Sequence, residues 1–135
     1  MHTKTFVSNS ESQELRELEE EIASWRNWWS ELSQIGQPHF GEMGDRLALF
    51  RRHLSAHFQH QEFHGPLAGH SDDDVAALWR DHALLLAELD VLVDRLHRCG
   101  PDVGCWGTAG KDVERLLEWL HQHEVRESQL VAALT

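Results

Sequence analysis

The chain has 135 residues, a length typical of a single domain and sufficient to bury a hydrophobic core. Hydrophobic residues make up 41% of the sequence and charged residues 26%, which excludes a disordered tail and fits an ordinary globular protein. Because 12 basic residues face 23 acidic ones, the formal net charge is −11. A surface this acidic argues against nucleic acid and anionic membranes as partners.

The N-terminal residues 1–9 are polar, and we expect them to form a flexible arm. They contain no apolar stretch typical of a signal peptide, and the longest apolar run, residues 83–87, is far shorter than a membrane span. We therefore expect a soluble, cytoplasmic protein. Cys99 and Cys105 are close enough in sequence to close a small disulfide, but two reduced thiols are the expectation in that compartment.

Four segments with helical periodicity follow the arm. The first spans residues 10–35 and the second residues 40–64, each with inward-facing residues at steps of three and four. The third begins at Ser71, an expected N-cap followed by three aspartates, and the fourth begins near Lys111 after a glycine-rich loop. No segment alternates with the period of a strand. Residues 10–135 are therefore predicted to form an all-α, antiparallel up-down-up-down four-helix bundle.

Polar residues interrupt the apolar stripe of three of these helices. They are His57 and Gln61 in the second segment, His82 in the third, and His123 and Glu127 in the fourth. Burying a polar group is unfavourable unless it finds a partner, and converging imidazoles and a carboxylate find one in a metal ion. Residues four apart lie on the same face of a helix, so His123 and Glu127 can bind one centre together.

At these residues the sequence resembles the hemerythrin family in its bacterial, HHE cation-binding form. Residues 54–67 (LSAHFQHQEFHGPL) resemble the family's H-x-x-x-E-E signature, and residues 120–131 (LHQHEVRESQLV) resemble its second H-x-x-x-E motif. Residues 79–89 (WRDHALLLAEL) resemble its third helix with a single histidine. The resemblance covers about residues 12–134 and implies a four-helix bundle with a non-haem di-iron centre. It places His57, His82, His123 and Glu127 at ligand positions.

Two departures from the family pattern alter the implied ligand set. The first motif has Gln61 in place of glutamate, and the adjacent Glu62 lies about 100° further round an ideal helix. The family also has a histidine in the first helix, where this chain has none. We expect apolar packing beside Trp25 and Trp29 to fill that place, with Glu21 as the alternative, an oxygen ligand. The remaining residues suit a single ion of iron, zinc or manganese. We rank such a mononuclear or altered site first, a di-iron site second and a vacant site third.

The expected function is non-catalytic metal binding by a monomer or homodimer. The metal would serve to bind or sense a small ligand such as O2 or NO, or the protein would handle the metal itself. One alternative is a metal-free four-helix interaction module, and a second is a di-iron oxidase or peroxidase-like enzyme. The pairs His53/His57 and His60/His64 are expected to be a solvated histidine-rich surface, with His64 as a candidate neighbour of the site.

Overall fold

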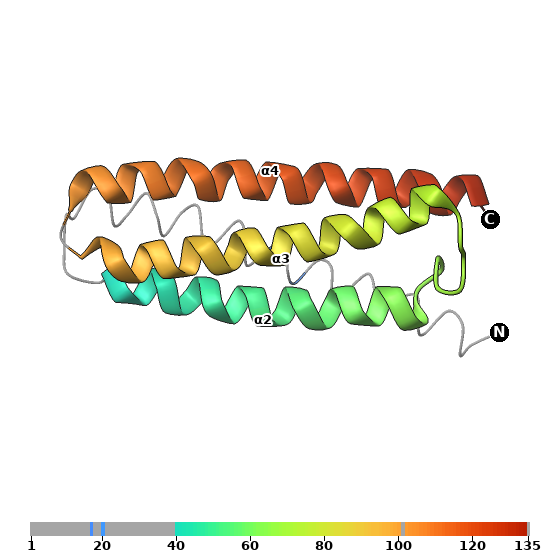
Figure 1. The fold of residues 1–135 in the computed structure, drawn as a ribbon, viewed down its shortest axis with the longest axis horizontal. Helices are drawn as coiled ribbons and strands as arrows, with labels where there is room; N and C mark the ends of the chain where they lie inside the picture. Colours follow the sequence, from blue (N-terminus) through green and yellow to red (C-terminus); the bar gives the residue numbers. More distant parts are fainter. Residues whose placement is uncertain (1–16, 18–19, 21–39, 101, 135) are drawn as a thin grey trace. The chain divides into compact units, whose positions relative to one another are not determined.

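A computed structural model of the chain describes residues 17, 20, 40–100 and 102–134. Within these residues there are three α-helices and no strand: α2 (Phe40–His64), α3 (Asp73–Cys99) and α4 (Val103–Leu134) (Figure 1). The chain divides into two compact units, residues 1–36 and 37–135, and the three helices belong to the second. The prediction of an all-helical fold is confirmed for this part of the chain. The helix expected over residues 10–35 lies outside the described residues, apart from Glu17 and Glu20.

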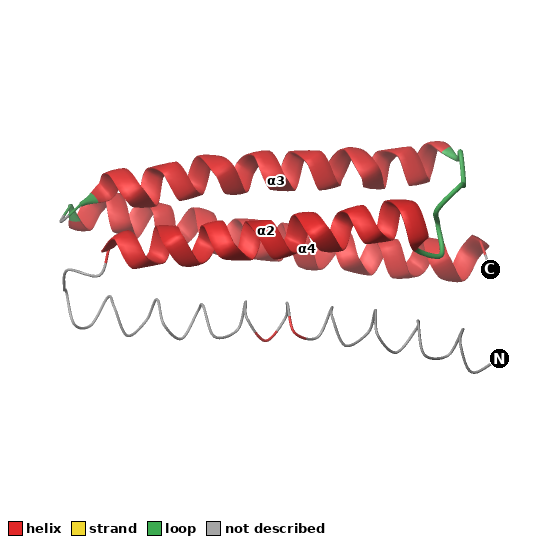
Figure 2. Ribbon diagram, turned by 90° about the horizontal axis from the view of Figure 1, so that it is seen from below, coloured by secondary structure: helices red, strands yellow, loops and turns green. Residues whose placement is uncertain are grey.

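The three helices run alternately up, down and up. Figure 1 shows α3 beside α2 and α4 and antiparallel to both, and Figure 2 shows the same helices turned by 90°. Helix α3 is packed against both neighbours along its length. This order and direction are those predicted for the second, third and fourth segments. None of the described helices combines the length and the apolar character needed to cross a membrane.

The hydrophobic core follows the predicted helical stripes. Every residue of the stripe predicted for α3 is buried, because steps of three and four keep these side chains on one face of the helix. The apolar side chains of the core come from all three helices. They are Met43, Leu47, Phe50, Leu54 and Phe58 of α2, Val75, Leu78, Leu85, Leu89, Leu92, Leu96 and Cys99 of α3, and Ala109, Val113, Leu116, Leu117 and Leu120 of α4. Leu67, in the connection between α2 and α3, is also buried.

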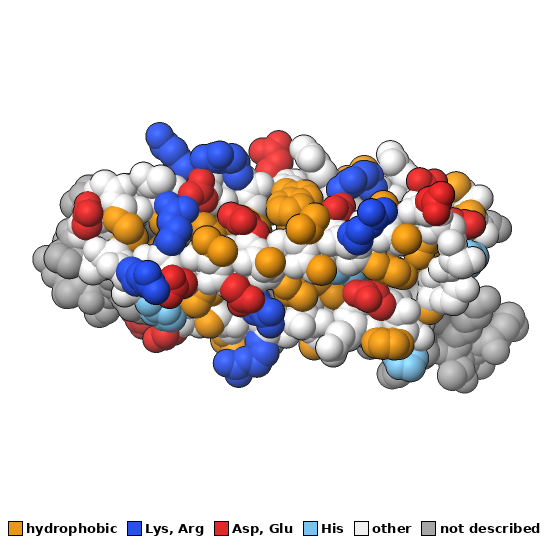
Figure 3. All heavy atoms as spheres, in the orientation of Figure 1, with side chains coloured by type: hydrophobic (Ala, Val, Ile, Leu, Met, Phe, Trp, Pro, Cys, Tyr) orange, Lys and Arg blue, Asp and Glu red, His pale blue; other side chains and the backbone are white. Residues whose placement is uncertain are grey.

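The outer surface mixes charges of both signs. Figure 3 shows acidic and basic side chains spread over one face of the molecule, with apolar side chains between them. The burial of α4 changes along its length. Beyond His123, each described residue of this helix is half-buried or exposed, whereas the turns before His123 carry most of its buried side chains.

Helix α3 begins one residue later than expected. Its N-cap is Asp72 rather than Ser71, and the carbonyl of Asp72 accepts the first helical hydrogen bond from the N–H of Ala76 (3.0 Å). The expected capping by the Ser71 hydroxyl is therefore wrong. The acids that drew attention to this position, Asp73 and Asp74, lie in the first turn, where the helix dipole favours negative charge.

Helix α4 begins at Val103, eight residues before the start predicted near Lys111. The side chain of Asp102 explains the difference, because its Oδ1 accepts the backbone N–H groups of Gly104 (2.9 Å) and Cys105 (3.2 Å). These bonds satisfy N–H groups that a helix start leaves without partners. The glycine-rich segment is therefore the first part of a helix and not a loop.

A disulfide joins the two helices at this turn. Cys99, the last residue of α3, is bonded to Cys105 in the first turn of α4, with their Cα atoms 5.5 Å apart. The expectation of two reduced thiols is wrong for this structure. The short connection through Gly100, which has a positive φ of 55°, and the early start of α4 bring the two cysteines within bonding distance.

Candidate metal centre

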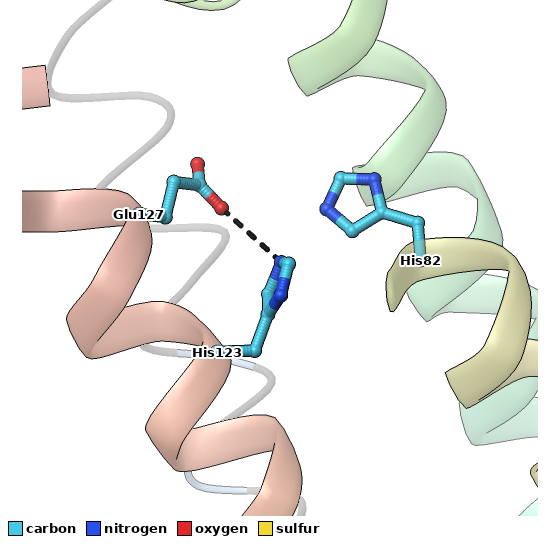
Figure 4. A group of neighbouring side chains, drawn as sticks. All are labelled: His82, His123 and Glu127. Atoms are coloured by element: carbon cyan, nitrogen blue, oxygen red, sulfur yellow. Dashed lines mark ion pairs between the residues drawn. The ribbon is translucent and has the colours of Figure 1, made fainter. Parts of the chain in front are cut away.

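Three potential ligands converge in the interior between α3 and α4. His82 points inward from α3, and His123 and Glu127 point towards it from consecutive turns of α4 (Figure 4). Each offers one ligand atom, and these atoms all lie within 4.8 Å of one another. His82 is 1% exposed and His123 is fully buried. The Nε2 atom of His123 lies 3.6 Å from Oε2 of Glu127, too far for a hydrogen bond.

Carboxylates on α2 and α3 hold the outward-facing nitrogens of both imidazoles. Nδ1 of His82 lies 2.9 Å from Oε2 of Glu62, and Nδ1 of His123 lies 3.4 Å from Oδ2 of Asp81. An ionised carboxylate only accepts hydrogen bonds, so each neutral imidazole places its proton on Nδ1 and its lone pair on Nε2. Both Nε2 atoms are buried and have no hydrogen-bond partner among the described residues.

Aromatic rings fix the orientation of the histidines. Phe58 of α2 stacks on His82, with ring centroids 3.7 Å apart and ring planes 4° from parallel. His123 meets His82 edge-on, with centroids 4.7 Å apart, and Trp79 lies 5.2 Å from His82 on the same helix. This packing surrounds the two imidazoles with apolar surface and limits their rotation.

The surroundings keep both imidazoles neutral. Burial, together with the nearby His123 and His57, lowers the pKa of His82 to about 3. Burial also lowers the pKa of His123, against the opposing effect of its hydrogen bond to Asp81. A neutral imidazole is the form that binds a metal ion. Burial raises the pKa of Glu62.

The structure brings together three of the four residues that the sequence pointed to most strongly. Among the described residues, the group consists of His82, His123 and Glu127. His57 is buried on α2 and lies outside this group. His57 nevertheless lies close enough to lower the pKa of His82. The stripe on α2 therefore correctly predicted that His57 faces inward.

The less certain candidates have other places. Gln61 donates from Nε2 to Oε1 of Glu127 at 2.6 Å, and Glu62 contacts His82, so both act on ligands of the group. Glu21 lies outside the described residues. His64 is exposed, with its ring 5.5 Å from that of His60, and so belongs to the histidine-rich surface and not to the site.

Sequence reasoning missed the residues that surround the ligands. Asp81, which precedes His82, contacts His123 on the neighbouring helix and is bound by Arg126 at 2.6 Å. Phe58 follows His57 in the sequence and stacks on His82. Asp81 is half-buried and precedes the inward-facing His82. Many charged residues at the edge of a helix face share this position, so the helical periodicity could not identify Asp81 as a partner of His123.

Comparisons of this chain with protein-family models, curated proteins and solved structures gave no match. The resemblance to the hemerythrin family rests on the motifs around His57, His82 and His123.

Proposed function

We propose that this protein binds a single transition-metal ion through Nε2 of His82, Nε2 of His123 and a carboxylate oxygen of Glu127. The proposal rests on the two buried Nε2 atoms, which have no hydrogen-bond partner among the described residues. Both lie close to the carboxylate of Glu127. An unsatisfied buried acceptor costs about 1–3 kcal/mol, and coordination of a cation removes this cost. Two imidazoles and a carboxylate suit zinc, iron(II) or manganese(II).

The proposed role is to hold an ion that binds or senses a small ligand such as O2 or NO, or to handle the metal itself. Iron is the first candidate because of the resemblance to the hemerythrin family. Gln61 favours one ion over two, because its amide nitrogen faces Glu127 where the family pattern has a second carboxylate. A di-iron oxidase or peroxidase-like enzyme is therefore a less favoured function than the binding of one ion.

We also propose that residues 10–35 complete a four-helix bundle of the hemerythrin type. The alternating directions of α2, α3 and α4, and the packing of α3 against both of its neighbours, agree with three consecutive helices of such a bundle. Short connections between successive helices favour this antiparallel order.

Elemental analysis of protein purified without a histidine tag tests the proposal. We expect one metal ion per chain in the wild type after reconstitution, its loss in His82→Ala, and wild-type content in the control His121→Ala. His121 is an exposed histidine of α4, so the control removes an imidazole without touching the group. Circular dichroism of each variant verifies that the helices form.

Three results contradict the proposal. Equal metal content in His82→Ala and the wild type shows that the ion is bound elsewhere. No metal in the wild type, even after reconstitution with iron, zinc and manganese, leaves a metal-free interaction module. Two irons per chain with an oxo-bridge absorption band in the near ultraviolet contradict the single-ion form and favour di-iron chemistry.

A further inference from the structure

Each member of the group has its second polar atom bound by a neighbouring side chain. Glu62 contacts Nδ1 of His82 at 2.9 Å, and Asp81 contacts Nδ1 of His123 at 3.4 Å. Gln61 donates a hydrogen bond to Oε1 of Glu127 at 2.6 Å. The atoms that remain directed at the group are therefore two Nε2 atoms and Oε2 of Glu127.

We infer that Glu62, Asp81 and Gln61 are positioning residues that select which atom of each ligand faces the metal ion. The inference rests on the proposed function and deepens it. A histidine ring that is free to change tautomer presents its lone pair on either nitrogen, whereas a carboxylate beside Nδ1 keeps the proton there. Such partners orient metal-bound histidines and make the ring a more basic ligand.

Asp81 also has a second partner on α4. Arg126 donates from its guanidinium to Oδ2 of Asp81 at 2.6 Å, and Arg126 lies three residues after His123 on α4. The side chain of Asp81 is 18% exposed and that of Arg126 is 54% exposed, so solvent reaches the arginine but mostly not the carboxylate. Asp81 thus links α3 to two successive positions on the face of α4 that carries the group.

Gln61 determines how Glu127 binds. Its amide binds Oε1 of Glu127, and Oε2 is the oxygen that lies 3.6 Å from Nε2 of His123. Binding through both oxygens, or bridging two ions, requires Oε1 as well. Gln61 therefore keeps Glu127 a ligand through one oxygen, which restricts the site to one ion.

Titration of the metal-free protein with Co²⁺ tests these roles, because the visible spectrum of Co²⁺ reports its coordination number. We expect Glu62→Gln and Asp81→Asn to weaken Co²⁺ binding by about 10- to 100-fold. In Gln61→Leu, Glu127 gains its second oxygen, and the visible bands weaken as they do when the coordination number of Co²⁺ rises. The control is Glu88→Gln, which removes an exposed carboxylate of α3 and should leave affinity and spectrum unchanged.

The thermal stability of each metal-free variant separates positioning from folding. Variants that fold as well as the wild type but bind Co²⁺ more weakly support the inference. If all three bind Co²⁺ with wild-type affinity and spectrum, the inference is wrong while metal binding stands. If the wild type binds no Co²⁺, the proposed function itself fails, and the two failures are thereby distinguished.

Discussion

The two buried histidines should make the metal-free protein sensitive to acid. The pKa of His82 is lowered from 6.5 to about 3, and that of His123 is also lowered. Above pH 6.5 neither state is protonated and the stability is fully present. Below it, the unfolded chain binds protons that the folded protein excludes, so the free energy of unfolding falls until the pH reaches the folded pKa. One pH unit below the unfolded value this loss is about 1.4 kcal/mol for His82, and His123 adds to it in the same direction.

Urea unfolding in the presence of a chelator, at about pH 7.5 and about pH 5.5, measures this loss. His82→Leu should reduce the loss between these two pH values by about 1.4 kcal/mol, and the exposed-site control His121→Ala should leave it unchanged. The raised pKa of Glu62 acts in the opposite direction. Its contribution to the free energy of unfolding falls as the pH rises from 4.5 through its folded pKa. An identical pH dependence in His82→Leu and the wild type would refute the reasoning.

Two further predictions concern the ends of the helices. Cys105→Ser removes the disulfide, which closes a loop with a sequence separation of 6, and should lower the free energy of unfolding by about 2 kcal/mol. Amide hydrogen exchange in residues 103–110 should become faster, and unchanged exchange there contradicts a role for the disulfide in holding this segment. Gly107→Ala should stabilise the protein by about 1 kcal/mol, because a Cβ there meets open space within the helix. Gly44→Ala should stabilise it less, because a Cβ there overlaps the imidazole of His97, which must move aside and leave its contact with Asp45; a melting temperature that rises as much in Gly44→Ala as in Gly107→Ala contradicts this contrast.

The sequence predicted those parts of the fold that depend on periodicity and on strong helix breakers. Helix α2 ends at His64 as expected, because Gly65 and Pro66 follow, and the buried stripe of α3 agrees at each position. The start of α4 was missed because the glycine-rich composition of residues 104–110 indicates a loop, and the contacts that stabilise a helix there cannot be read from composition. The carboxylate of Asp102 and the disulfide of Cys105 stabilise helical turns that their composition disfavours.

The candidate site was predictable as far as it interrupts an apolar pattern. His82 and His123 stand at inward positions of leucine-rich stripes, and the i,i+4 spacing brought Glu127 to the same face. The pattern gives the face of a helix but not the rotation of side chains on a neighbouring helix. The contacts of Asp81 with His123 and of Gln61 with Glu127 depend on such rotations, and no spacing within one segment reveals them.

The uneven burial of α4 has a consequence for the kinetics of metal exchange. Glu127 belongs to the half of the helix beyond His123, where each described residue is half-buried or exposed. Weakly packed helix ends fray on their own while the core stays folded, so they exchange fastest. For the proposed ion, fraying of this end would withdraw one ligand and open a path, with both imidazoles still held by Phe58 and the packed helices. Loading and release would then proceed at the rate of local opening, far faster than global unfolding.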